Sequence, residues 1–200
     1  MGTHLFELPP NLPRPVDDGA AAHLLGSSLP DVAFPSTDGT SVNLGNLRGL
    51  WVIYIYPMTG RPDVPLPDGW DGIPGARGCT LQSCSFRDHY EELNALRAGV
   101  FGLSAQASDD QREARDRLHL PFQLLSDSSL ELKRTLRLPT FTVEGIELLK
   151  RLTLIAEDGK IGKVFYPVFP PDRNADDVLV WLRSNAQPGA AGDTPPAARP

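Results

Sequence analysis

The sequence lacks the features of a nucleic-acid-binding or membrane protein. Its 25 Asp and Glu outnumber 19 Lys and Arg among 200 residues, and no run rich in Lys and Arg is present. Binding to nucleic acid needs clustered positive charge that neutralises phosphates, so we expect no nucleic-acid partner. No apolar stretch is long enough to span a bilayer, and the N-terminus lacks the basic region and apolar core of a secretory signal. These absences predict a cytoplasmic protein without membrane association.

Cysteine is also scarce, since the chain contains only Cys79 and Cys84. In a reducing cytosol, a cysteine pair more often reacts or binds metal than stabilises the fold as a disulfide. A zinc site is not expected, because the spacing of the pair is not that of a zinc knuckle and the four histidines are dispersed. We therefore expect no metal and no cofactor. The placement of both cysteines in one segment instead indicates redox chemistry of the sulfurs themselves.

Proline is the abundant exception, with 20 residues that gather near the two ends of the chain and in one internal stretch. This pattern predicts an extended N-terminal arm over 1–28, one domain over 29–186 and a disordered tail over 187–200. Within the domain, 58–77 has no hydrophobic period and predicts a long loop. Loops of that length are uncommon in compact domains and are often functional.

Strands and helices alternate along the predicted domain. The β-branched and aromatic run 51–56 predicts a buried central strand. After the long loop, a helix is predicted over 80–98 with Gly99 as its C-terminal cap. The remaining predicted elements are a strand pair within 29–44, strands 100–103 and 122–125, helices 108–118 and 129–136, hairpin strands 150–156 and 161–166, and helix 174–184. Ser108 and Gln111 would form a capping box. The order predicts an α/β fold with a mixed sheet flanked by helices.

Cys79 lies where the long loop turns into the predicted helix. Unpaired N–H groups and the positive end of the helix dipole at such a position favour a thiolate over a thiol. Cys84 is five positions further on, which in an α-helix is about 7.5 Å of rise and about 140° of rotation. A disulfide needs Cα atoms within about 7 Å and converging Cβ directions. If the two cysteines form a disulfide, the start of this helix must therefore unwind.

At these residues the sequence resembles the peroxiredoxins, and within them the peroxiredoxin Q or bacterioferritin-comigratory group. The resemblance covers about 26–186 and rests on motifs spread over the domain. They are Leu29-Pro-Asp-Val-Ala-Phe, Tyr54-Ile-Tyr-Pro57, Gly78-Cys79-Thr80 with Cys84 and Phe86-Arg87-Asp88, Leu124-Leu-Ser-Asp127, Leu138-Pro-Thr, and Arg151-Leu-Thr-Leu-Ile.

The resemblance implies a thioredoxin-like fold and thiol-dependent reduction of hydrogen peroxide and organic hydroperoxides. Cys79 would be the peroxidatic cysteine, and Cys84 would resolve its sulfenic acid as an intrachain disulfide that a thioredoxin-type dithiol reduces. Arg151 would reach the peroxidatic sulfur and stabilise the thiolate and the peroxide. Pro57 and Gly78 would border the substrate. Because resolution occurs within one chain, we expect a monomer or a weak dimer.

The loop before Cys79 departs from the family pattern Pro-x-x-x-Thr-x-x-Cys. Ala76 stands where the pattern has threonine, and 58–77 carries a long insertion. Thr59 or Thr80 could supply the missing hydroxyl, or neither. The insertion could be a lid or docking surface with Trp70 as its apolar anchor, or a tolerated surface loop.

The missing threonine leaves other functions open. One is a redox sensor or disulfide-exchange protein on the same fold that lacks fast peroxide turnover. Another is a binding module whose interface is the insertion.

Overall fold

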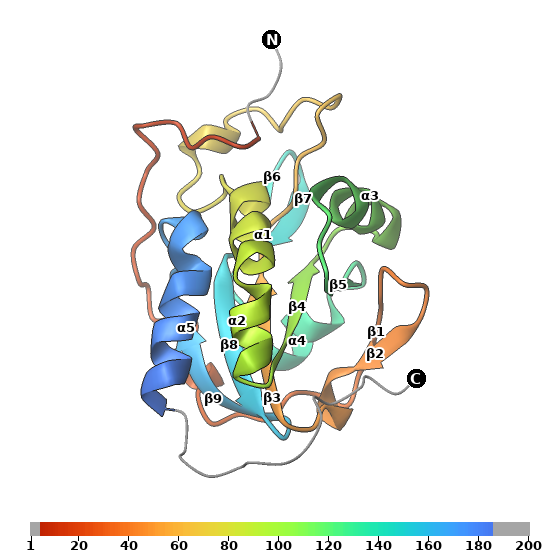
Figure 1. Cartoon of the computed structure of the whole chain (residues 1–200). Coiled ribbons are helices and arrows are strands. Elements are labelled where there is room, and N and C mark those ends of the chain that lie inside the picture. Colours follow the sequence, from red (N-terminus) through yellow and green to blue (C-terminus); the bar gives the residue numbers. More distant parts are fainter. Residues whose placement is uncertain (1–4, 186–200) are drawn as a thin grey trace.

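The structure, a computed structural model, describes residues 5–185 and is built around a five-stranded sheet in the order β5-β4-β3-β8-β9 (Figure 1). β3 (Leu50–Ile55) is the central strand, and β4 (Ala98–Ser104) and β5 (Gln123–Ser126) extend the sheet from it in parallel. β8 (Leu152–Glu157) pairs antiparallel with β3, and β9 (Lys160–Phe165) pairs antiparallel with β8. The predicted mixed sheet is confirmed.

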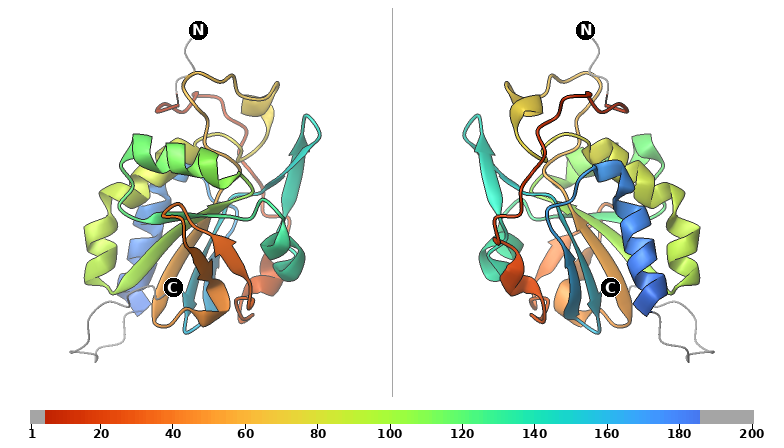
Figure 2. Two further views of the ribbon diagram at one scale, coloured as in Figure 1. Left: turned by 90° about the vertical axis from the view of Figure 1, so that its right-hand side faces the viewer. Right: turned by 90° about the vertical axis from the view of Figure 1, so that its left-hand side faces the viewer.

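Helices cover both faces of this sheet (Figures 1 and 2). Four of them share a hydrophobic cluster on one face: α1 (Cys79–Asp88), α2 (Tyr90–Ala95), α3 (Ser108–Leu118) and α5 (Asn174–Asn185). A second cluster on the opposite face joins α4 (Glu131–Leu136), the hairpin of β1 (Ala33–Pro35) and β2 (Ser41–Asn43), and the 3₁₀ helices Ala22–Leu24 and Leu44–Asn46. The fold is thioredoxin-like.

The side chains of β3 alternate between the two clusters. Val52 and Tyr54 belong to the cluster under α1 and α5, whereas Trp51, Ile53 and Ile55 belong to the opposite one. Successive residues of a strand point to opposite faces of its sheet. Because both faces are covered, the strand is apolar throughout, which is why its sequence predicts a buried central position.

The single helix predicted over 80–98 is wrong in its extent. α1 ends at Asp88 and α2 is separate, with His89 between them. Gly99 is not a helix cap but the second residue of β4, which begins before the predicted strand 100–103. A Cβ on Gly99 would lie 2.5 Å from the Trp51 ring, so the absence of a side chain permits a close approach between neighbouring strands.

The predicted capping box at the start of α3 is also wrong. Ala107 occupies the N-cap position, and Ser108 is the first residue of the helix. Gln111, the expected partner, is buried and donates from Nε2 to the Ser104 hydroxyl at 3.0 Å and to the Leu125 carbonyl at 2.7 Å. Its amide therefore connects α3 to the sheet instead of capping the helix.

The hairpin of β6 (Thr140–Val143) and β7 (Ile146–Leu149) was not predicted from the sequence. Its turn residues Glu144 and Gly145 have φ angles of 49° and 79°. A type I′ hairpin turn needs positive φ at both central positions, and Asn-Gly or Asp-Gly is the sequence signal that predicts it. Glu-Gly does not carry that signal, so this hairpin was missed.

The N-terminal arm lies against the domain. Leu24, in its 3₁₀ helix, is part of the core, and the Asp18 carboxylate accepts hydrogen bonds from Lys150 Nζ and the Tyr166 hydroxyl, each at 2.8 Å. Within residues 5–185, no helix is both long and apolar enough to cross a membrane. The predicted tail 187–200 lies outside the described residues.

Candidate active site

Cys79 is the first residue of α1, and the glycine before it determines how that helix begins. Gly78 is the N-cap and has a φ of 97°, a conformation that favours glycine. A Cβ there would lie 2.4 Å from Pro171 Cγ and 2.9 Å from Leu8 Cδ2. The predicted position of Cys79, at the turn from loop into helix, is confirmed.

The sulfur of Cys79 is buried beside the guanidinium of Arg151. Arg151 Nη2 donates to Cys79 Sγ at 3.0 Å, and the two side chains are 4% and 3% exposed. The Ala76 carbonyl oxygen is 3.5 Å from the same sulfur. Arg151 directly precedes β8, so the sheet brings it to α1 from 72 residues away in the sequence. The contact that the family resemblance implied is therefore present.

The remaining donors of Arg151 meet neutral acceptors. Nη1 donates to Gln82 Oε1, while Nε and Nη2 donate to the carbonyls of Gly75 (3.2 Å), Ala76 (3.0 Å) and Arg77 (3.1 Å). Among the residues that the structure describes, no carboxylate is within ion-pair distance of Arg151. A buried charge without a counter-charge is costly, and a thiolate on Cys79 provides one. The Arg151 guanidinium is therefore placed where it can donate to the Cys79 sulfur.

Gln82 binds the other terminal nitrogen of the Arg151 guanidinium, Nη1. Sequence reasoning did not identify this residue. Its amide is fully buried, with Oε1 accepting from Arg151 and Nε2 donating to Asn174 Oδ1 at 2.8 Å. The Thr153 hydroxyl donates to the same Asn174 oxygen at 2.7 Å. This network connects α1 to β8 and α5. The signal for it was the spacing of three residues from Cys79, which places both side chains on one side of a helix.

The comparisons with known proteins agree with this geometry. A family model described as Redoxin matches residues 24–179. Peroxiredoxin bcp1 of Schizosaccharomyces pombe is 34% identical over 141 residues, which are 68% of this chain and 64% of the relative. Peroxiredoxin Bcp of Escherichia coli is 30% identical over 166 residues, which are 80% of this chain and 96% of the relative. The chain is a peroxiredoxin of the Q or Bcp group.

A solved structure has the same fold as this peroxiredoxin. The crystal structure of peroxidoxin BcpB from Mycobacterium tuberculosis matches with a TM-score of 0.67 at 25% identity. The match covers 82% of this chain and 98% of that one. The thioredoxin-like fold is thus confirmed by comparison as well as by the order of its strands.

The peroxiredoxin has two candidates for the missing threonine hydroxyl. Thr80 lines the cavity beside Cys79. The Thr59 hydroxyl instead donates to Gln106 Oε1 at 3.1 Å, and the Thr59 N–H donates to the same oxygen at 2.8 Å. Thr80 is therefore the better placed of the two. At position 76 itself, the backbone carbonyl accepts a hydrogen bond from Arg151 Nη2 at 3.0 Å.

The insertion and the β6–β7 hairpin together form a small hydrophobic core next to the peroxiredoxin site. Trp70 is 4% exposed, and its ring centroid lies 6.0 Å from that of Phe141 on the β6–β7 hairpin. The Asp68 N–H donates to Glu144 Oε1 at 3.0 Å. The expected role of Trp70 as an apolar anchor agrees with this packing. Pro57, which directly precedes the insertion, is buried next to the end of β3.

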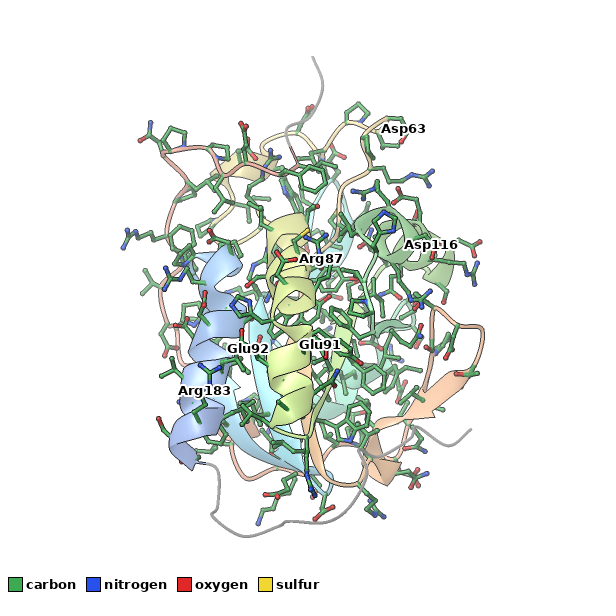
Figure 3. All side chains as sticks on the ribbon, in the orientation of Figure 1. Asp63, Arg87, Glu91, Glu92, Asp116 and Arg183 are labelled. Atoms are coloured by element: carbon green, nitrogen blue, oxygen red, sulfur yellow. The ribbon has the colours of Figure 1, made fainter. Side chains whose placement is uncertain are left out.

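Cys84 lies further along α1, and both cysteines are free thiols. Burial raises the pKa of the Cys84 thiol, and the positive charge of Arg87 opposes that rise only in part. Figure 3 shows Arg87 projecting from α1, while Glu92 of α2 and Arg183 of α5 face each other lower down and form an ion pair. Because α1 is continuous from Cys79 to Cys84, a disulfide between them requires the helix to open.

The site shows no arrangement for a metal ion. Within residues 5–185, no group of three or more His, Cys, Asp or Glu side chains is placed to hold one. Beneath α1, the Tyr54 hydroxyl donates to the Ser83 hydroxyl at 3.1 Å, and its ring stacks on Phe86 at 4.5 Å. Burial raises the pKa of Tyr54 well above its usual value, so it remains neutral beneath the cysteines.

Proposed function

We propose that this peroxiredoxin reduces hydrogen peroxide and organic hydroperoxides through Cys79, with Cys84 as the resolving cysteine and a thioredoxin-type dithiol as the final reductant. As a member of its family the chain is a thiol peroxidase that uses a thioredoxin-like reductant. The observation that supports the residue assignment best is the hydrogen bond of 3.0 Å from Arg151 Nη2 to Cys79 Sγ.

In the first step the Cys79 thiolate attacks one oxygen of the peroxide. An S–O bond forms while the O–O bond breaks, so the sulfur is oxidised to a sulfenic acid and the peroxide is reduced. The second oxygen leaves as an alkoxide or hydroxide and takes up a proton to become an alcohol or water. Arg151 stabilises the thiolate before the attack and the negative charge on the oxygens during it.

In the second step the Cys84 sulfur attacks the sulfenic sulfur of Cys79. An S–S bond forms, the S–O bond breaks and water leaves. The step requires α1 to open, because the two cysteines are five positions apart in one helix. Opening also exposes Cys84, which removes the burial that raises its pKa. A reduced dithiol then exchanges with the Cys79–Cys84 disulfide. The exchange restores both cysteine thiols and converts the dithiol into a disulfide.

Consumption of NADPH coupled through thioredoxin and its reductase tests the activity. The wild type is expected to consume hydrogen peroxide and an alkyl hydroperoxide, and Cys79→Ser is expected to consume neither. If Cys79→Ser is as active as wild type, the assignment of the peroxidatic cysteine is wrong. Formation of a disulfide without turnover would instead support the second candidate function, a redox sensor or disulfide-exchange protein, which the absent threonine at Ala76 leaves open.

Hydrogen exchange tests the opening of α1. Protection over residues 79–88 is expected to be lower in the disulfide form than in the reduced protein. Unchanged protection in a sample shown by mass spectrometry to contain the disulfide would refute the proposed opening.

We also propose that the protein is cytoplasmic. Because resolution within one chain needs no partner subunit, we propose that it is a monomer or a weak dimer.

A further inference from the structure

The cavity at the Cys79 sulfur is too small for most peroxides. Its volume is about 10 Å³, which is space for about one water molecule. Much of its lining is apolar and comes from outside the five-stranded sheet: Leu5 from the N-terminal arm, and Met58, Leu66 and Trp70 from the insertion. We call these four side chains the cover. Any peroxide with an organic group must displace part of the cover to reach the sulfur.

Two leucines of the cover meet over Gly60. A Cβ on Gly60 would lie 2.7 Å from Leu5 Cδ2 and 3.0 Å from Leu66 Cδ2. Leu5 is 7% exposed, although Phe6, which follows it, is 57% exposed. The arm therefore turns the smaller apolar side chain toward the cavity and the larger one away from it. In Figures 1 and 2 the arm and the insertion run close together above the start of α1.

Leu5 is the member of the cover that can yield at the lowest cost. Trp70 is held by Phe141 of the β6–β7 hairpin, and the insertion that carries it is held to the same hairpin by Asp68. Leu5 belongs to no helix or strand. Displacing Leu5 disturbs neither the sheet nor α1.

We propose that Leu5 occupies the place of the organic group of a hydroperoxide and so determines which peroxides react at Cys79. Hydrogen peroxide needs a small opening and is reduced with Leu5 nearly in place. An organic hydroperoxide displaces the Leu5 side chain, and its apolar group then packs against Leu66 and Trp70. The inference rests on the proposed peroxidase function and assigns the arm and the insertion a role in substrate selection.

The test compares kcat/KM for cumene hydroperoxide with kcat/KM for hydrogen peroxide in the coupled assay. Leu5→Ala frees most of the volume of one leucine side chain, so we expect the ratio to rise about tenfold while the value for hydrogen peroxide changes by less than about twofold. Leu5→Phe enlarges the occupant and is expected to lower the ratio. Phe6→Ala is the matched control, because it removes a larger side chain from the same arm but from a position that is mostly exposed.

The outcomes separate this inference from the function on which it rests. A ratio that moves in opposite directions in the two Leu5 variants, with Phe6→Ala at the wild-type value, supports it. Intact turnover with an unchanged ratio overturns the role of Leu5 and leaves the peroxidase function standing. Equal acceleration for both peroxides also overturns it, because a general barrier does not select by size. No Cys79-dependent turnover in wild type overturns both. Thermal melts verify that each variant is folded.

Discussion

Replacing Arg151 with methionine should slow the oxidation of Cys79 while leaving the cysteine in place. Methionine keeps much of the apolar stem and removes the guanidinium that donates to Cys79 Sγ at 3.0 Å. Loss of one preorganised donor to a developing negative charge typically costs about 10²–10³ in rate, or about 2.7–4 kcal/mol. We expect the second-order rate constant with hydrogen peroxide to fall by that factor. Arg151→Lys should be intermediate, since an ammonium keeps the charge without the fork.

The same substitution should also lower stability, because Arg151 holds the end of the insertion. Without its guanidinium, the carbonyls of Gly75, Ala76 and Arg77 lose their donor. A buried polar group without a partner costs about 1–3 kcal/mol, and removal of a buried charge offsets part of that cost. The melting temperature of Arg151→Met should therefore fall, and rates must be measured well below it.

Rapid quenching followed by mass spectrometry provides the assay. In a Cys84→Ser background the Cys79 sulfenic acid cannot be resolved within the chain. Its formation can therefore be followed by chemical trapping of the sulfenic acid and measurement of the protein mass. Arg134→Met is the matched control, because the Arg134 side chain is 57% exposed and pairs with Glu131 at the surface. A folded Arg151→Met variant that reacts within about threefold of the background protein would refute the role of Arg151.

Three further substitutions test other parts of the site and its surroundings. Gln82→Leu should slow Cys79 oxidation about tenfold in the same quench assay, because Arg151 loses the partner that orients it, and an unchanged rate would contradict that positioning. Asp18→Asn should lower the melting temperature at neutral pH, because hydrogen bonds from Lys150 and Tyr166 lower the pKa of Asp18. These bonds stabilise the fold at pH values above 3.8, the ordinary pKa of the group. Since that contribution disappears as the pH falls through the depressed pKa, melts should show the difference from wild type shrinking in acid. Thr59→Val should leave the peroxidase rate within about twofold of wild type, since its hydroxyl is bonded to Gln106, and a larger loss would place it in the site.

The parts of the structure that the sequence predicted depend on local patterns or on the family resemblance. A run of β-branched and aromatic residues predicts the buried strand 51–56 without knowledge of its neighbours. Cys79 and Cys84 are close in the sequence, so helix geometry alone predicts that the helix must open for a disulfide to form between them. Arg151 is different, because nothing local distinguishes it from a surface arginine. The family resemblance identified it.

The parts that were missed depend on contacts between distant segments. Gly99 looks like a helix cap until the Trp51 ring is seen to occupy the space of its absent side chain. Gln111 fits a capping box by spacing, but the sheet offers its amide two better partners. The insertion has no hydrophobic period because its apolar residues pack against the arm and a hairpin, not along one face of a helix or strand. Such packing leaves no periodic signal in one segment.

The burial of Trp70 gives the protein a fluorescence signal next to Cys79. Its indole lines the Cys79 cavity and is 4% exposed, so contact with water would move its emission to longer wavelengths. Trp51, which is stacked on Phe101 at 4.7 Å within the sheet, and Trp181 of α5 would contribute the background. A difference spectrum between wild type and Trp70→Phe would isolate the indole beside Cys79. Stopped-flow emission could then time the uncovering of the sulfur within a single catalytic cycle, without any added dye.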